Sequence, residues 1–209
     1  MRVPALIALA CALAAPARAA DVVVSLVTPA GKPVSNAVVT LKPQGGLPRG
    51  PIRFPWPMTM AQRDMQFEPF VLIVPVGADV AFPNLDRVRH HVYSFSPAKT
   101  FELKLYGRDE TRVVHFDKPG VVPLGCNIHD SMVAFVLVVD TPYAGMTDAS
   151  GQAVIHGVPP GAQAVRVWHP YLRAPGNAVS VAAAVPQDGA VRVQATGDLW
   201  TPVQPHRMY

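Results

Sequence analysis

The segment GCNIHDSM, residues 125–132, places a thiol, an imidazole and a thioether close together at Cys126, His129 and Met132. These are soft and borderline donors, which suit copper better than magnesium or calcium, and a thioether is unusual in a structural zinc site. Cys126 is also the only cysteine after the first twenty residues, so it has no disulfide partner there. The segment therefore points to a copper site, and a buried, unreactive thiol is the alternative.

A trigonal copper centre needs a second imidazole from elsewhere in the chain. His90 and His91, in the segment FPNLDRVRHHVYSFS, open a predicted strand that continues with Val92 and Tyr93. Neighbouring residues of a strand point to opposite faces. Only one of the two histidines can therefore face the metal, and strand alternation does not say which.

The elements around Cys126 predict a hairpin that can aim these donors at one point. The valine-rich stretch over 111–126 reads as strand, with a turn at 118–120 where Lys, Pro and Gly follow one another. Residues 127–132 form a tight loop, and the segment MVAFVLVVD leaves it as another strand. A strand, loop and strand in this order bring Cys126, His129 and Met132 together.

The composition predicts an all-β protein. The chain has 209 residues with 23 Pro and 15 Gly, and short valine-rich runs lie between these breakers. The start, MRVPALIALACALAAPARAAD, has the charge, the apolar run and the small residues of a secretory signal cleaved near residue 20. We therefore expect a periplasmic protein, with a lipid anchor at Cys11 as the alternative.

The charge and hydropathy exclude two classes of partner. Loss of Arg2 and Arg18 with the signal lowers the formal charge from +4 to +2, which is too small to indicate nucleic-acid binding. No later segment has the run of apolar residues that a transmembrane helix needs, so we expect no membrane insertion of the mature chain.

The segments HHVYSFS and YGRDETRVVHFDKPGVVPLGCNIHDSM together resemble cupredoxins. The spacing of the loop is similar to that of amicyanin, and its His-to-Met interval is shorter than in plastocyanin. The longer segment FEPFVLIVPVGADVAFPNLDRVRHHVYSFSPAKTFELKLY resembles the plastocyanin-like proteins often labelled methylamine utilization proteins. The resemblance implies a cupredoxin Greek-key sandwich over residues 62–140. It also implies a copper ion bound by His90, Cys126, His129 and Met132, with His91 at a position where the family commonly has Asn.

The same resemblance implies a carrier of single electrons between redox protein partners, rather than an enzyme. The copper would alternate between Cu(I) and Cu(II), Met132 would be the weak axial ligand, and His129 would be the electron exit. Copper storage or delivery is one alternative, in which Met58, Met60 and Met65 would add thioether ligands. A binding scaffold without redox activity is another.

The flanking segments DVVVSLVTPAGKPVSNAVVTLKP and TPYAGMTDASGQAVIHGVPPGAQAVRVWHPYL resemble the two halves of a carboxypeptidase-regulatory, transthyretin-like β-sandwich. We expect residues 21–44 and 141–200 to form this sandwich, with the copper domain inserted into it after a Pro/Gly linker at 45–61 and a tail at 201–209. Insertion is plausible because the ends of a domain often lie close together. Two modules joined in line are the alternative, and Trp168 is expected in the sandwich core.

Overall fold

The computed structural model describes residues 19–186 and 190–200. Almost all of the predicted signal, residues 1–20, lies outside these residues, as do Cys11 and the tail at 201–209. Within the described parts the chain is all-β, as predicted, with one short 3-10 helix, η1 (Pro175–Asn177). No helix in these parts has the length and the apolar character that crossing a membrane requires.

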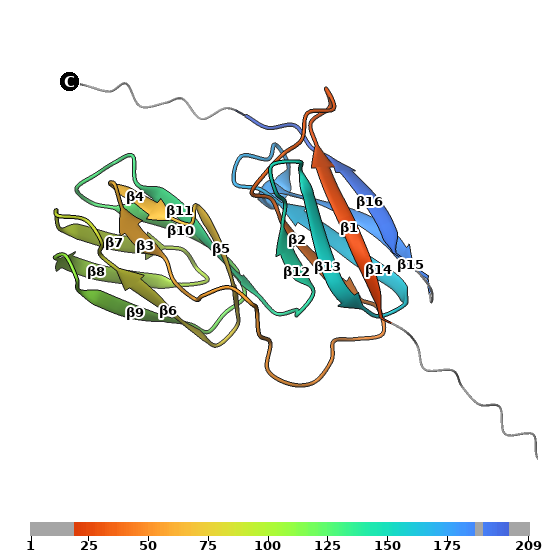
Figure 1. Ribbon diagram of the computed structural model, residues 1–209, viewed down its shortest axis with the longest axis horizontal. Coiled ribbons are helices and arrows are strands. Elements are labelled where there is room, and N and C mark those ends of the chain that lie inside the picture. Colours follow the sequence, from red (N-terminus) through yellow and green to blue (C-terminus); the bar gives the residue numbers. More distant parts are fainter. Residues whose placement is uncertain (1–18, 187–189, 201–209) are drawn as a thin grey trace, which may run out of the picture.

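The middle of the chain folds as a β-sandwich, which we call the copper-side domain after the copper site that the sequence predicts in it. Its strands are β3 (Ala61–Arg63), β4 (Gln66–Glu68), β5 (Val71–Pro75), β6 (Ala78–Pro83), β7 (His90–Phe95), β8 (Thr100–Tyr106), β9 (Thr111–Phe116), β10 (Gly120–Cys126) and β11 (Val133–Val139). One layer is a five-stranded sheet in the order β5-β11-β10-β7-β8 (Figure 1). The pairs β6-β9 and β3-β4 pack against this sheet across a shared core.

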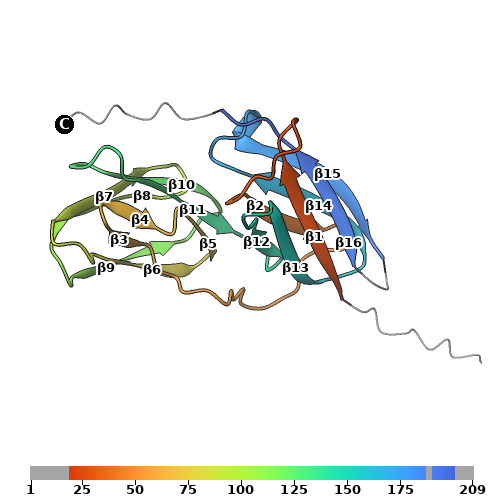
Figure 2. The same ribbon diagram turned by 45° about the horizontal axis from the view of Figure 1, so that its top comes forward.

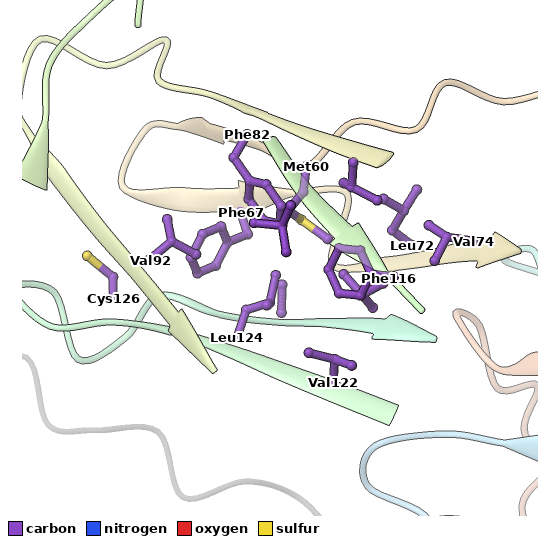
Figure 3. Packing of buried hydrophobic residues seen from close by; sticks show 14 of the residues in the cluster. Met60, Phe67, Leu72, Val74, Phe82, Val92, Phe116, Val122, Leu124 and Cys126 are labelled. Carbon is purple, nitrogen blue, oxygen red and sulfur yellow. The ribbon is translucent and has the colours of Figure 1, made fainter. Parts of the chain in front are cut away.

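Alternation along β10 explains where the thiol lies. Val122, Leu124 and Cys126 point into the core and are almost fully buried. Burying a valine or leucine side chain contributes roughly 1.5–3 kcal/mol, and a one-residue slip of register would turn the whole row outward. The register is therefore strongly specified, and it places Cys126 at one end of the apolar cluster, beyond Val92 and Leu124 (Figure 3).

The segments before and after the copper-side domain form a second sandwich, which we call the flanking sandwich. Its strands are β1 (Ala20–Val27), β2 (Val38–Pro43), β12 (Ala144–Met146), β13 (Gln152–Val158), β14 (Gly161–Trp168), β15 (Ala178–Val185) and β16 (Val191–Thr196). One sheet has the order β13-β1-β16 and the other β12-β2-β14-β15 (Figures 1 and 2). Strands from both sides of the copper-side domain thus share each sheet. The boundaries predicted at residues 44, 61 and 140 stay predictions.

The end of the predicted linker at 45–61 packs into the copper-side domain. Met60 is fully buried in its core, and the backbone N–H of Met60 donates to the carbonyl of Ala81 at 2.8 Å. Thr59 forms a parallel bridge with the same residue. The many prolines and glycines of this segment predict a loop. A composition pattern does not reveal that single backbone groups of such a loop pair with a neighbouring strand, as those of Thr59 and Met60 do.

The two sandwiches share an apolar contact surface. Val71 and Ile73 of β5 and Leu137 of β11 lie on the outer face of the five-stranded sheet, and they pack in one buried cluster with Val38 and Trp168 of the flanking sandwich. Trp168 is 2% exposed. It was expected in the core of the flanking sandwich, but Val165 and Val167 take that core. The outward position of Trp168 follows from strand alternation.

We predict that the flanking sandwich folds without its insertion. The N–H of Leu41 donates to the carbonyl of Tyr143 at 2.9 Å, and the hydroxyl of Thr141 donates to the carbonyl of Leu41 at 2.7 Å. The chain therefore leaves β2 and returns to β12 at neighbouring points. Replacing residues 44–140 by an Asn-Gly turn should leave a chain with β-type circular dichroism and one cooperative denaturant transition.

Two further changes sharpen this test. Val38→Thr and Trp168→Thr keep the uncovered face from aggregating. As a matched control, Val39→Asp in the same shortened chain places a charge in the core and should abolish the transition. A shortened chain that shows no cooperative unfolding even without Val39→Asp would mean that the two segments do not form an autonomous domain.

Candidate metal centre

Three donor side chains meet at the end of the copper-side domain. Cys126 ends β10, His90 begins β7, and His129 lies in the loop between β10 and β11. Their ligand atoms all lie within 4.8 Å of one another. Cys126 and His90 are 3% and 0% exposed, whereas His129 is partly exposed. The structure thus brings together donors that are far apart in the sequence.

The distances fit donors that share one ion. The Sγ atom of Cys126 lies 3.8 Å from Nδ1 of His90 and 3.8 Å from Nδ1 of His129. A thiol carries one proton and can donate to only one of these nitrogens. By contrast, metal bonds of roughly 2.0–2.3 Å, as in zinc sites, separate a sulfur and a nitrogen by roughly 3.8 Å at a trigonal angle. The spacing therefore suits a shared metal ion better than a thiol–imidazole hydrogen bond.

Met132 lies beside these donors in the fold. It is 1% exposed and belongs to the same buried cluster as Cys126. Its backbone N–H donates to the carbonyl of His129 at 2.9 Å, which closes the loop as a tight turn. A thioether is therefore present at this end of the core, and the full ligand set of His90, Cys126, His129 and Met132 stays a prediction.

Of the two neighbouring histidines, His90 is the one in the cluster. His91 points to the other face of the sheet, where its ring lies edge-on to Tyr93 at 6.4 Å between centroids. Its Nε2 atom is 2.9 Å from Oε1 of Glu102 but lacks the angle of a hydrogen bond. We regard this contact as electrostatic only, because hydrogen bonds weaken steeply as they bend. His91 is thus placed to contact the loop through its backbone, and its side chain lies outside the donor cluster.

The backbone of His91 ties the loop that carries His129 to β7. The N–H of Asn127 donates to the carbonyl of His91 at 3.1 Å, which continues the ladder in which Cys126 is paired with Val92. Just before the thiol, a Cβ atom on Gly125 would lie 2.8 Å from the ring of Tyr93. Only glycine lets this ring cover the backbone there. Main-chain contacts thus hold the loop beside His91.

Asp86 orients the ring of His90. Its Oδ2 atom lies 2.7 Å from Nε2 of His90, and the backbone N–H groups of Asp64 and Met65 donate to its carboxylate at 2.6 and 3.0 Å. Partial burial raises the pKa of Asp86, but these hydrogen bonds and the nearby imidazole outweigh burial and hold the pKa below its usual value. The carboxylate is therefore ionised at neutral pH.

An ionised Asp86 fixes the tautomer of His90. A carboxylate only accepts hydrogen bonds, so Nε2 of His90 must carry the proton in this pair. The lone pair of a neutral His90 is then on Nδ1, which is the atom that faces Cys126. Such a carboxylate–histidine contact commonly orients a metal-binding imidazole and strengthens it as a ligand.

Asn84 holds the loop that carries Asp86. It is fully buried, its side-chain amide donates to the carbonyls of Val88 and Tyr106 at 2.9 and 3.0 Å, and its Oδ1 accepts from the N–H of Asp86 at 2.9 Å. Burial raises the pKa of Tyr106, whose hydroxyl donates to the side chain of Gln62. Each buried polar atom named here has a partner, which avoids a penalty of about 1–3 kcal/mol for an unmade hydrogen bond.

Sequence reasoning missed Asn84 and Asp86, although one signal was present. Both lie in the segment FPNLDRVRHH, and Asp86 precedes His90 by four residues. Asparagine and aspartate often hydrogen-bond to the backbone of nearby turns. That signal predicts a turn, but it does not show which imidazole the carboxylate reaches.

The three methionines of the alternative copper cluster lie in different surroundings. Met60 is buried in the core, Met58 packs against that core, and Met65 is 51% exposed in the turn between β3 and β4. Met60 and Met58 therefore act as packing residues, as methionine often does.

Comparison with known proteins gives partial similarities. No family model matches the chain, and no curated protein matches it. The Cu-containing nitrite reductase from Thermus scotoductus is 28% identical, with a TM-score of 0.39, over 42% of this chain and 23% of the reductase. The chain thus spans less than a quarter of the reductase. A purple cupredoxin from Nitrosopumilus maritimus is 22% identical, with a TM-score of 0.36, over 39% of this chain and 98% of the cupredoxin.

A reduced amicyanin variant is also 22% identical, with a TM-score of 0.37, over 40% of this chain and 82% of the amicyanin. The β-sandwich with clustered His and Cys donors at one end is the cupredoxin-like fold that the resemblance predicted. Because the similarities cover part of the chain and have TM-scores below 0.5, the function proposed below rests on the geometry of these side chains.

We predict that Asp86→Asn weakens metal binding. The amide keeps the size of the carboxylate but removes its charge and its fixed role as an acceptor, so the His90 ring loses its orientation. Copper affinity, measured by competition with a chelator, should fall roughly 10–100-fold.

Asp79→Asn is the matched control for this prediction. Asp79 and His115 form an exposed pair whose Oδ1 and Nδ1 atoms are also 2.7 Å apart, away from the donors. This variant should bind copper as the unchanged protein does. Equal affinities for both variants and the unchanged protein would show that Asp86 has no part in metal binding.

Proposed function

We propose that this protein is a periplasmic carrier of single electrons with a type 1 copper site formed by His90, Cys126, His129 and Met132. The observation that supports it most directly is the convergence of two imidazole Nδ1 atoms on one thiol at 3.8 Å. Cys126 is the only free cysteine in the described chain, and it is buried. Thiolate and imidazole ligands in a trigonal set, with a weak thioether, are typical of such copper sites.

Copper bound in this site would supply the exchange of one electron between Cu(I) and Cu(II). The chain contributes a rigid frame, since His90 begins β7 and Cys126 ends β10, and buried side chains fix the registers of both strands. Asp86 and Asn84 hold His90, and the turn between His129 and Met132 holds the loop. A frame that keeps the donors in one arrangement in both oxidation states lowers the rearrangement that accompanies each transfer.

Electron exchange with a partner would occur through the loop that carries His129. The side chain of His129 is partly exposed, and its neighbour Ile128 is 46% exposed. His90 is fully buried and offers no contact to a partner. The donor and the acceptor would be other redox proteins that cover this loop, and we propose no catalytic reaction at it.

Copper storage or delivery is the second candidate. It would need extra thioethers near the donors, but Met60 and Met58 take part in core packing. The periplasmic location depends on the signal predicted at residues 1–20.

The first test is a titration of the purified protein with Cu(II). We expect intense visible absorption from thiolate-to-copper charge transfer, which is lost in a reversible way on reduction. Cys126→Ser should abolish this band, whereas circular dichroism should show the same β fold. His91→Ala should keep the band and His90→Ala should lose it. Colourless binding of Cu(I) alone would support storage instead, and no copper uptake would leave a scaffold.

A second prediction concerns the axial ligand. Met132→Leu should retain copper and the charge-transfer band but raise the reduction potential, because Cu(II) loses a weak donor. Voltammetry of the two proteins measures the change. Met58→Leu, which alters a thioether outside the donor set, should leave the potential where it was. An unchanged potential in Met132→Leu would show that the thioether is not a ligand.

A further inference from the structure

A cleft of about 290 Å³ lies between the two sandwiches, away from the donor cluster. One wall comes from the flanking sandwich and the other from β10, β11 and the turn before β10. Its lining includes Thr40, Lys42 and Arg166 on one side and Val121, Leu137 and Asp140 on the other. The copper-side wall is mostly apolar, whereas the opposite wall carries two cations and a hydroxyl.

The register of the flanking sandwich explains why these groups share one wall. Trp168 is paired with Val38, and both lie in the apolar contact between the sandwiches. Two residues further along the same strands, Arg166 is paired with Thr40, and side chains two apart lie on the same face. The contact surface is thus apolar at the pair Trp168 and Val38. At the pair Arg166 and Thr40 it opens into a cleft with polar groups on one wall.

Arg166 has no partner among the residues that the structure describes. None of its guanidinium N–H groups makes a hydrogen bond or an ion pair with residues 19–186 or 190–200, although the residue is only partly exposed. Burial lowers its pKa from the usual value. Arginine still keeps its charge at neutral pH. A half-buried guanidinium with five donors therefore faces the cleft, where its nitrogens reach solvent and have no protein partner among the described residues.

The other charges of the cleft balance each other. Nζ of Lys42 lies 2.7 Å from Oδ2 of Asp140, so this pair joins the two sandwiches at the edge of the cleft. The charge that remains is the one on Arg166. A guanidinium matches the two oxygens of a carboxylate in a bidentate contact, and a single positive charge suits a monoanion. The apolar side chains opposite, such as Val121 and Leu137, suit a body without polar groups.

We propose that this cleft binds a small carboxylate with an apolar body, held by Arg166. The carboxylate of the ligand would accept hydrogen bonds from the guanidinium of Arg166. The hydroxyl of Thr40, on the adjacent strand, is a further donor. The apolar body would lie against β10 and β11. Because the ligand would touch both sandwiches, it would stabilise their contact. The proposal does not depend on copper, and it holds for the apoprotein as well.

Benzoate and its neutral isostere benzamide test this proposal. We expect calorimetric titration of the full-length protein to show saturable binding of benzoate and a rise in the unfolding temperature, since a ligand that binds only the folded state stabilises it. Benzamide should bind roughly tenfold more weakly or worse, because it lacks the charge-assisted hydrogen bonds. Equal binding of the two compounds, or no binding of benzoate, would overturn the proposal.

Variants locate the site. Arg166→Gln should weaken benzoate binding roughly tenfold or more, and Arg166→Lys, which keeps the charge but not the planar fork, should weaken it less. Arg192→Gln makes the same change on the exposed face of β16 in the other sheet and should bind like the unchanged protein. If Arg166→Gln did not fold, Arg166→Lys would still decide. Benzoate binding that is unaffected in the folded Arg166 variants would overturn the assignment.

Discussion

The geometry of the donor cluster depends on one partly buried carboxylate. Asp86 keeps its charge although its side chain is 11% exposed, because His90 and two backbone N–H groups surround it. Removing a charge from water is costly unless hydrogen bonds replace the lost hydration. The groups that donate hydrogen bonds to Asp86 come from β7 and from the turn after β3. The charge therefore ties together two segments that are distant in the sequence. If this carboxylate moved, both the ring of His90 and the turn would lose their positions.

The turn that supplies these N–H groups is itself strained. Asp64 and Met65 both have a left-handed backbone, with φ of 52° and 54°. This conformation is tolerated by aspartate but is uncommon for a residue such as methionine. Consecutive N–H groups in such a turn converge on one point, and here the point is the carboxylate of Asp86. The hydrogen bonds to the charge offset the strain, which explains why the exposed Met65 is held in this conformation.

The sequence predicts the class of fold and the types of donor, because both depend on local information. Valine-rich runs between prolines and glycines specify strands, and Cys126, His129 and Met132 lie in one short loop. Strand alternation alone does not decide between His90 and His91. It shows that the two side chains lie on opposite faces of the strand, but it does not show which face is buried. That choice is set by pairing with other strands, including a bulge between His90 and Val92 opposite β8. The roles of Asp86 and Asn84 depend likewise on contacts across the fold, as does the position of Trp168 between the sandwiches.

The connections between the two sandwiches fix the position of the two walls of the cleft. A single linker would let two domains rotate, but here the chain crosses twice, before β3 and after β11, and an apolar surface joins the two bodies (Figure 1). The Lys42–Asp140 pair adds a third contact at the edge of the cleft. Together, the two crossings and the apolar surface hold Arg166 opposite the apolar wall formed by β10 and β11. β10 thus carries both Val121, which lines the cleft, and Cys126, which ends the strand at the donor cluster.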